Sequence, residues 1–217
     1  PMVILAEEIC RLKLLSEAHE QRLKKLEFSA CGKEPATPRS LSLNNPIDTD
    51  VLQAQRLTML EWTGKNAFQI LFDSKDTGLD VEQFHHAVHG VDTAAVYVFT
   101  DQNDVFGGFI GAPLERPREF TTDPNHFIFS LQCNGRVPTP KRWFQKAELR
   151  EKPTAVWMSQ GCNCFIGFGG CSINIDRRPN ESYCLMLEHS YDGVGESLLT
   201  GTKHFTVRRI VLVKLVE

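Results

Sequence analysis

Apolar residues in the first part of the chain recur at alternating spacings of three and four, which is the pattern of a coiled coil. The stretch Met2–Phe28 contains no glycine, and a heptad assignment places most of its seam positions on apolar residues. We therefore predict that residues 1–28 form a self-associating helix, in an orientation that the flanking charges leave open. The alternative is an amphipathic helix that folds back on its own domain. The predicted seam includes Leu5, Ile9, Leu12, Ser16, His19, Leu23 and Leu26.

The apolar period stops between residues 29 and 53. Gly32, Pro35, Pro38 and Pro46 occur there among serine, threonine and asparagine. This composition is typical of a linker, because glycine and proline interrupt regular structure. The predicted helix and the rest of the chain are therefore expected to have separate roles.

A second domain is predicted over residues 54–217, beginning with a short helix at Ala54–Glu61. The next segment, Ala67–Phe72, alternates with a period of two and is predicted to be a strand. This alternation would place Phe68, Ile70 and Phe72 on one face.

A helix is predicted over Val81–His89, with Asp80 as its N-cap and Gly90 at its end. Val81, Phe84 and Val88 have the spacing of a core-facing stripe. Asp80 can accept hydrogen bonds from the first free N–H groups of this helix.

The remaining apolar segments are short and are predicted to be strands. The polar residues 101–104 can close a tight hairpin, and Ile210–Val213 is apolar on both faces and should be central. Many short strands with few helices predict an α+β domain, a two-sheet antiparallel β-sandwich flanked by short helices and preceded by the coiled-coil helix. The predicted strands are Ala95–Phe99, Val105–Gly111, His126–Leu131, Cys162–Phe168, Cys171–Ile175, Tyr183–Leu187 and Phe205–Val216.

Several of these segments, in this order, resemble the TLDc domain family. The run FQILFDSKDTGLDVEQF at Phe68–Phe84 is similar to the opening of that domain, and DVFGGFIGAP at Asp104–Pro113 is similar to its hairpin strand. HFIFSL, the glycine-rich stretch within Cys164–Ile175, and the closing FTVRRIVLVKL follow. The resemblance covers about Leu57–Glu217. The chain departs from the family pattern at Val211, where a glutamate is usual, and in its shortened glycine-rich stretch.

The resemblance implies a protein-interaction domain associated with resistance to oxidative stress. In several members it also implies binding to the vacuolar proton-pumping ATPase. It implies no catalytic reaction, so the function it suggests is an association with a protein partner.

Length and composition agree with one globular domain plus attachments. The chain has 217 residues, 41% of them hydrophobic, and a formal charge of −3. Its apolar runs are shorter than the roughly 20 residues of a membrane-spanning helix, so we expect no membrane insertion. The seven cysteines are scattered, which favours thiols in a reducing compartment and a cytoplasmic or nuclear location. The near-neutral charge gives no overall nucleic-acid footprint.

Cys162 and Cys164 are two residues apart, so both thiols would point to one face of a strand. A redox pair or a zinc site is conceivable at this spacing. Structural zinc sites more often have two to four residues between paired cysteines. Redox reactivity needs exposure and nearby positive charge. Buried, inert cysteines are the favoured interpretation.

His85 and His89 lie four residues apart on the predicted helix, a spacing that can hold a metal ion. The glutamate of the HExxH pattern is replaced by His86, and no third ligand is evident. A solvated helix face is the favoured interpretation, and neither a metal nor a cofactor is expected.

A group of basic residues with an aromatic neighbour is the pattern expected for contacts with phosphates and bases. Together with a dimerising helix, such a group could hold two half-sites of a duplex, so a sequence-specific DNA-binding regulator is an alternative function. Acidic residues are mixed into this group, and surface charge often serves only solubility. The candidate contacts are Arg136, Lys141, Arg142, Trp143, Lys146, Arg177 and Arg178.

The sequence thus favours a non-enzymatic, homo-oligomeric interaction protein in which the helix sets assembly and the sandwich presents a surface to a protein partner. A DNA-binding regulator and a thiol-dependent antioxidant are the two alternatives.

Overall fold

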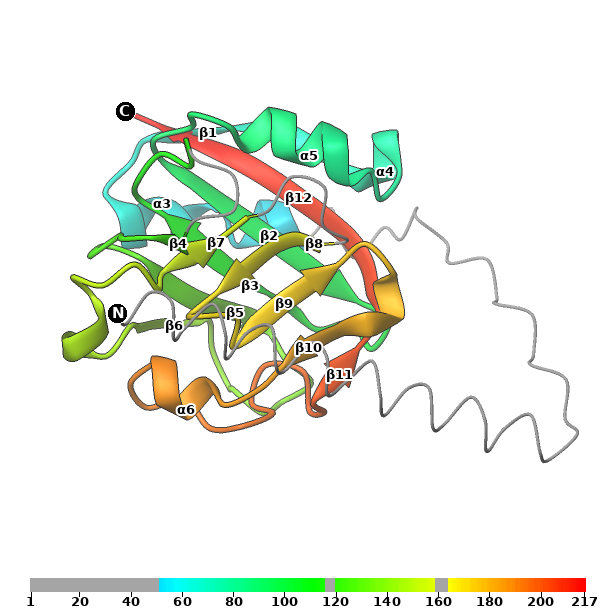
Figure 1. Ribbon diagram of the computed structural model, residues 1–217. Coiled ribbons are helices and arrows are strands. Elements are labelled where there is room, and N and C mark those ends of the chain that lie inside the picture. Colours follow the sequence, from blue (N-terminus) through cyan, green and yellow to red (C-terminus); the bar gives the residue numbers. More distant parts are fainter. Residues whose placement is uncertain (1–50, 116–119, 159–163) are drawn as a thin grey trace, which may run out of the picture. The chain divides into compact units, whose positions relative to one another are not determined.

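The computed structural model describes residues 51–115, 120–158 and 164–217, which belong to one compact unit, Ser42–Glu217 (Figure 1). The predicted coiled-coil helix and the linker up to residue 50 lie outside the described residues. In the part of the chain that the structure describes, no helix has the length and hydropathy needed to cross a bilayer.

Two antiparallel sheets form the domain, so the predicted sandwich is confirmed. The first sheet has the order β1-β12-β2-β3-β5-β6. The hairpin of β2 and β3 turns through residues 101–104 as predicted, with Asn103 at a φ of 62°. The strand bounds are β1 Ala67–Asp73, β12 Val207–Val216, β2 Ala94–Thr100, β3 Val105–Ile110, β5 Phe127–Gln132 and β6 Lys141–Phe144.

The second sheet is made of shorter strands, in the order β11-β10-β9-β8-β7-β4. The strand predicted at Tyr183–Leu187 is wrong in its second half, because Met186 has a φ of 52° and a helix begins at Leu187. The strand bounds are β11 His204–Phe205, β10 Ser182–Cys184, β9 Ile173–Asp176, β8 Cys164–Phe168, β7 Val156–Trp157 and β4 Phe120–Thr121.

Strand β12 separates two apolar clusters, which confirms its predicted central position (Figure 1). Ile210 and Leu212 point into the core between the sheets, and Val211 and Val213 point to the opposite face. Helix α3, Arg56–Thr63, packs on that opposite face through Met59. Burying each such side chain contributes about 1.5–3 kcal/mol to the stability of the fold. Strand β12 has buried side chains on both of its faces.

The two sheets approach closely at β3. A side chain on Gly108 would place its Cβ only 2.6 Å from the ring of Phe168. Gly108 therefore leaves the space that the fully buried Phe168 ring occupies in the inner core.

Short helices flank the sandwich (Figure 1). The prediction for α5, Val81–Val88, is confirmed, including its cap, because the Asp80 carboxylate accepts from the N–H groups of Glu82 and Gln83. The helix ends one residue before the predicted His89. Helix α3 runs to Thr63, beyond the predicted Glu61, and Gly64 ends it in the left-handed conformation. The other helices are α4 Ser74–Thr77, α6 Leu187–Ser190, η1 Ala147–Leu149 and η2 Pro179–Glu181.

The prediction that Phe68, Ile70 and Phe72 share one face of β1 is wrong. The register with β12 shifts between Ile70 and Phe72, so Leu71 forms a bulge. A bulge breaks the alternation of side chains. Phe68 consequently packs against the cluster under α3, whereas Phe72 is buried in the core between the sheets, and Ile70 stays 45% exposed.

Candidate binding groove

An open groove of about 630 Å³ lies between β1 and the helices α4 and α5. Its floor is mainly apolar and its remaining walls are polar. We call this surface the β1–α5 groove. It is lined by Ile70, Leu71, Phe72, Asp73, Asp76, Thr77, Glu82, Gln83, His86 and Ala87.

The local sequence explains this composition. Helix α5 buries Val81, Phe84 and Val88 in the core. The residues between them, Glu82 and His86, are therefore exposed and line the groove. On the β1 side of the groove, Ile70 is 45% exposed.

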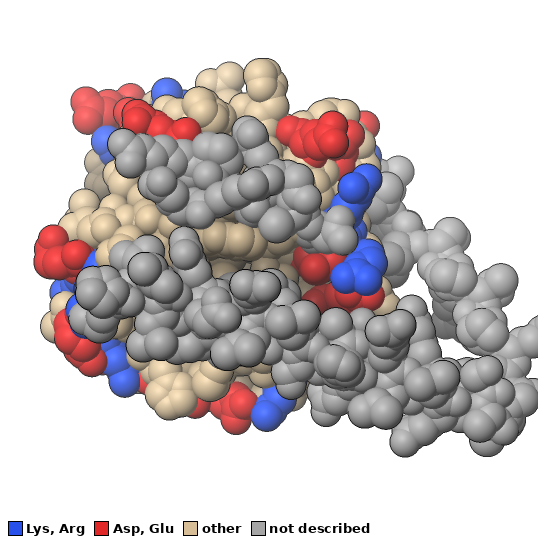
Figure 2. Space-filling model, in the orientation of Figure 1, with Lys and Arg blue, Asp and Glu red and all other residues tan. Residues whose placement is uncertain are grey.

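The groove is acidic. Its lining contains three carboxylates, and the residues described there include neither lysine nor arginine. Among the described residues, Asp76 and Glu82 form no ion pair, so their charges face solvent. Figure 2 shows acidic side chains gathered at the end of the molecule where α4 and the start of α5 lie.

Asp73, the third carboxylate of the groove, forms a buried ion pair with Arg209 of β12. The two side chains are 8% and 5% exposed and form a bidentate pair, with Arg209 Nε 2.9 Å from Asp73 Oδ1. Asp73 also caps α4 by accepting from the N–H of Lys75. The next residue, Ser74, accepts from the N–H of Ile210 at 2.9 Å. These bonds fix the end of β1 and the start of α4 on β12.

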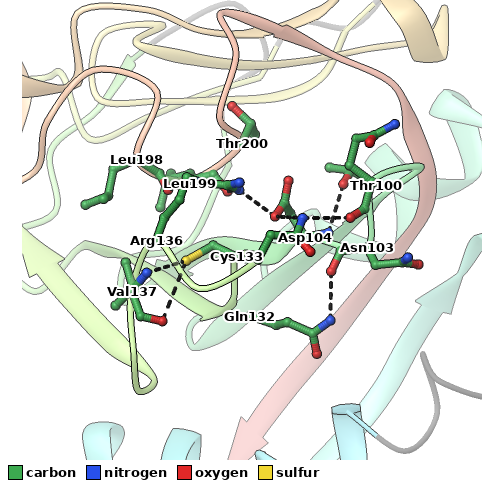
Figure 3. A network of polar contacts seen from close by, with 12 residues as sticks. Thr100, Asn103, Asp104, Gln132, Cys133, Arg136, Val137, Leu198, Leu199 and Thr200 are labelled. Atoms are coloured by element: carbon green, nitrogen blue, oxygen red, sulfur yellow. Dashed lines mark hydrogen bonds and ion pairs between the residues drawn. The ribbon is translucent and has the colours of Figure 1, made fainter.

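A second buried carboxylate, Asp104, anchors a polar network at the turn after β2 (Figure 3). Arg136 Nη2 lies 2.5 Å from Asp104 Oδ1, and Arg136 also donates to the carbonyl groups of Leu198 and Leu199. Burial raises the pKa of Asp104 above its ordinary value, and the charge of Arg136 opposes this shift. Arg136 thus joins two loops of the fold, which is a structural use of a residue predicted to contact phosphates.

Other residues of the predicted nucleic-acid surface are also engaged in the fold. Trp143 is 3% exposed and belongs to the inner core, so its ring cannot stack on a base in this conformation. Arg142 donates to the carbonyl of Trp62, and its guanidinium lies 5.3 Å from the ring centre of Phe127 and 5.0 Å from that of Phe144.

The remaining basic candidates are spread over the molecule. Lys141 is exposed, with its ammonium 5.4 Å from the Trp143 ring, and Lys146 is half-buried. Arg178 pairs with Asp176 and Glu181. Arg177 is exposed and lines an adjoining polar depression, which shares Thr77 and Glu82 with the groove. The structure does not bring these residues together, and nucleic-acid contact stays a prediction.

The two buried histidines in the described part of the chain are structural links. His85 is 5% exposed, and its Nε2–H donates to the carbonyls of Cys164 and Phe165 at 3.1 and 2.9 Å. Burial lowers the pKa of His85. His89 is exposed and lies beyond the end of α5, so the solvated helix face predicted for this pair is wrong for His85.

His126 is 1% exposed and lies between the two sheets. Its Nδ1 donates to the Phe109 carbonyl at 2.6 Å, and its Nε2 accepts from the Tyr191 hydroxyl at 2.8 Å. The ring stacks on Phe168. Burial lowers the pKa of His126 to about 4, so the imidazole is neutral at physiological pH.

Cys162 lies outside the described residues, so the redox pair stays a prediction. Cys164 is 5% exposed, and its Sγ is 2.9 Å from the side-chain oxygen of Asn174. Cys133, Cys171 and Cys184 are also buried, and burial raises the pKa of Cys184. Every described cysteine is therefore shielded from solvent, as the favoured interpretation expects.

Sequence reasoning missed Asp73, Asp104 and His126, which carry the buried polar contacts. They lie in the segments that carry the family resemblance, but those segments do not show that the side chains are buried, and their partners lie far away in the chain. It also missed the β1–α5 groove, whose walls meet only through the tertiary fold.

The comparisons with known proteins agree with this architecture. The sequence model of the TLDc domain matches residues 44–210, which is well over half of the chain. The comparison with curated proteins finds no match.

Proposed function

We propose that this chain, which belongs to the TLDc domain family, is a non-enzymatic interaction protein of the oxidative-stress response. TLDc domains are associated with oxidative-stress-related proteins and are generally non-catalytic. We further propose that it binds a protein partner as a coiled-coil oligomer, with the vacuolar proton-pumping ATPase as the candidate partner.

One observation supports a binding role most directly. Two side chains suited to chemistry are used inside the fold: Arg136 holds Asp104, and His126 accepts from the Tyr191 hydroxyl. The β1–α5 groove, in contrast, presents carboxylates and an exposed apolar side chain to solvent. A rigid scaffold with a chemically open surface is suited to recognition.

The oligomer gives the binding role a physical advantage. Two linked copies of a domain convert the second binding event into an intramolecular one, which raises apparent affinity for a target with repeated sites. The predicted helix at residues 1–28 would supply this link.

Binding of the full chain to isolated membranes that contain the vacuolar proton-pumping ATPase tests the proposal. We expect saturable binding that is lost when the ATPase is stripped from the membranes. The Leu12→Glu/Leu23→Glu variant should sediment as a monomer and bind at least about tenfold more weakly.

A matched control adds the same two charges elsewhere, at the exposed positions Leu57 and Ala147. This Leu57→Glu/Ala147→Glu variant should keep both its oligomeric state and its affinity. Equal binding to stripped membranes would reject the ATPase as partner, and an unchanged affinity of the monomeric variant would reject the role of the helix.

A further inference from the structure

We infer that the β1–α5 groove is the docking site for a partner segment in which large apolar side chains are flanked by lysine or arginine. This inference rests on the proposed binding role and specifies the surface and the chemistry of the ligand. It is carried by the shape of the groove, its apolar floor and its unpaired charge.

The apolar floor provides an anchor point. Among the described residues, Leu57 and Ile70 are the large hydrophobic side chains that remain exposed, and Ile70 is the one that lines the groove. Leu71, Phe72 and Ala87 continue the apolar surface next to it. A partner side chain placed here would remove apolar area from water on both molecules, which is the main source of binding free energy.

The negative charge of the groove determines which residues can flank the apolar side chains of the partner segment. Asp76 and Glu82 stand at the groove without an ion-pair partner among the described residues, and Asp73 adds a carboxylate whose charge Arg209 already balances. Arg177 lines a neighbouring depression of about 310 Å³ and is not part of the groove lining. A cationic segment is therefore attracted, and an anionic one is repelled.

The walls of the groove are fixed before a partner arrives. Asp80 Oδ1 accepts from the N–H groups of Glu82 and Gln83 at 3.0 Å each, and Asp80 Oδ2 accepts from Gln83 Nε2 at 3.0 Å. The pair of Asp73 and Arg209 fixes the opposite wall. Preorganised walls lower the entropy cost of binding. β1 is the outermost strand of its sheet, and among the described residues no strand pairs with its outer edge.

The experiment measures binding of two labelled, capped peptides to the full chain by fluorescence anisotropy at low ionic strength. The first peptide has a Leu-Phe-Leu core flanked by two lysines on each side, and the second has glutamates in place of the lysines. We expect the lysine peptide to bind and its affinity to fall as salt is added, because screening weakens the ionic contacts. The glutamate peptide should bind at least about tenfold more weakly.

Substitutions assign the binding to the groove. The isosteric variant Asp76→Asn/Glu82→Gln should bind the lysine peptide about threefold to tenfold more weakly, as expected for the loss of two exposed ionic contacts. Ile70→Ser should weaken binding about fivefold through lost apolar contact. The matched controls Glu148→Gln/Glu151→Gln and Leu57→Ser change exposed residues that do not line the groove, and they should bind like the unmodified chain.

Equal binding of the two peptides, or unchanged binding of the lysine peptide by both groove variants, would overturn the inference. The proposed function is tested separately. If the groove variants bind membranes containing the vacuolar proton-pumping ATPase as well as the unmodified chain does, the binding role stands and the groove is not its surface. If they lose that binding while keeping their melting temperature, both statements are supported.

Discussion

The β1–α5 groove and the buried polar contacts use the same side-chain chemistry in opposite ways. In the interior, Asp73 faces Arg209, Asp104 faces Arg136, and His126 lies between a carbonyl and a hydroxyl. In the groove, Asp76 and Glu82 face solvent without an ionic partner among the described residues. The interior groups fix loops and strands, and the groove groups stay available. Changes to the first should therefore affect stability, and changes to the second should affect binding.

The largest effect is expected for Asp73→Ala, because it leaves the Arg209 guanidinium buried without its carboxylate. We expect a loss of about 3–5 kcal/mol in the free energy of unfolding, measured by urea denaturation of the full chain. The double variant Asp73→Leu/Arg209→Met removes both charges and should recover a large part of that loss. If Asp73→Ala unfolds at the same urea concentration as the unmodified chain, the pair does not stabilise the fold.

The second effect is a pH dependence that comes from His126. Its folded pKa of about 4 lies below the ordinary value of 6.5, because burial disfavours the charged form. The unfolded chain therefore binds a proton that the folded chain does not as pH falls from about 6.5 to about 4. The contribution of neutral His126 is complete above pH 6.5, and on the order of 3 kcal/mol is lost by pH 4.

Unfolding measured at pH 7 and pH 4.5 checks this prediction. His126→Gln should be less stable at pH 7 but should lose less stability on acidification. His189→Gln, which replaces an exposed imidazole, is measured beside it as the matched control. An equal loss on acidification for the His126 variant and the unmodified chain would contradict the assigned cause.

Arg142 is intermediate between interior and surface, and so is its expected effect. Arg142→Met keeps much of the side-chain volume but removes the bond to the Trp62 carbonyl and the contacts with the Phe127 and Phe144 rings. We expect a loss of about 1–2 kcal/mol in unfolding free energy. Lys141→Met, on the neighbouring exposed residue, is the control and should change stability by less than about 0.5 kcal/mol. A stability loss no larger than that of the control would show that Arg142 does not link α3 to β6.

The smallest stability effect is expected in the groove itself. Ile70→Ser should shift the unfolding free energy by less than about 0.5 kcal/mol, similar to Leu57→Ser, because both side chains are already exposed. Thermal unfolding of the two variants side by side checks this. A loss above about 2 kcal/mol for Ile70→Ser alone would mean that Ile70 supports the fold and that its exposure is not kept for a partner.

Local sequence patterns were sufficient to predict the elements whose formation depends on neighbouring residues. The Asp80 cap, the core stripe of α5 and the doubly apolar β12 are visible as residue patterns, and the structure confirms each. The bulge at Leu71 is not visible in this way. It arises from the pairing of β1 with a strand far along the chain, and it changes which faces Phe68 and Phe72 occupy.

The groove and the buried contacts were also not predictable, because they too are formed by residues that are far apart in the sequence. Basic residues such as Arg136 look alike in a sequence whether they face solvent or a buried carboxylate 32 residues away. The strand β6, Lys141–Phe144, lies inside the segment that the sequence pattern predicts to be a basic surface. Its pairing with β5 buries Trp143 and directs Arg142 onto aromatic rings.

The position of β12 between β1 and β2 has a consequence for biosynthesis. Both neighbours leave the ribosome more than a hundred residues before β12 does. At roughly 5–20 residues per second, the backbone edges that later pair with β12 stay unpaired for on the order of ten seconds. During that interval the nascent polypeptide carries an unfinished sheet, so chaperones that shield such edges should associate with it until β12 has left the ribosome.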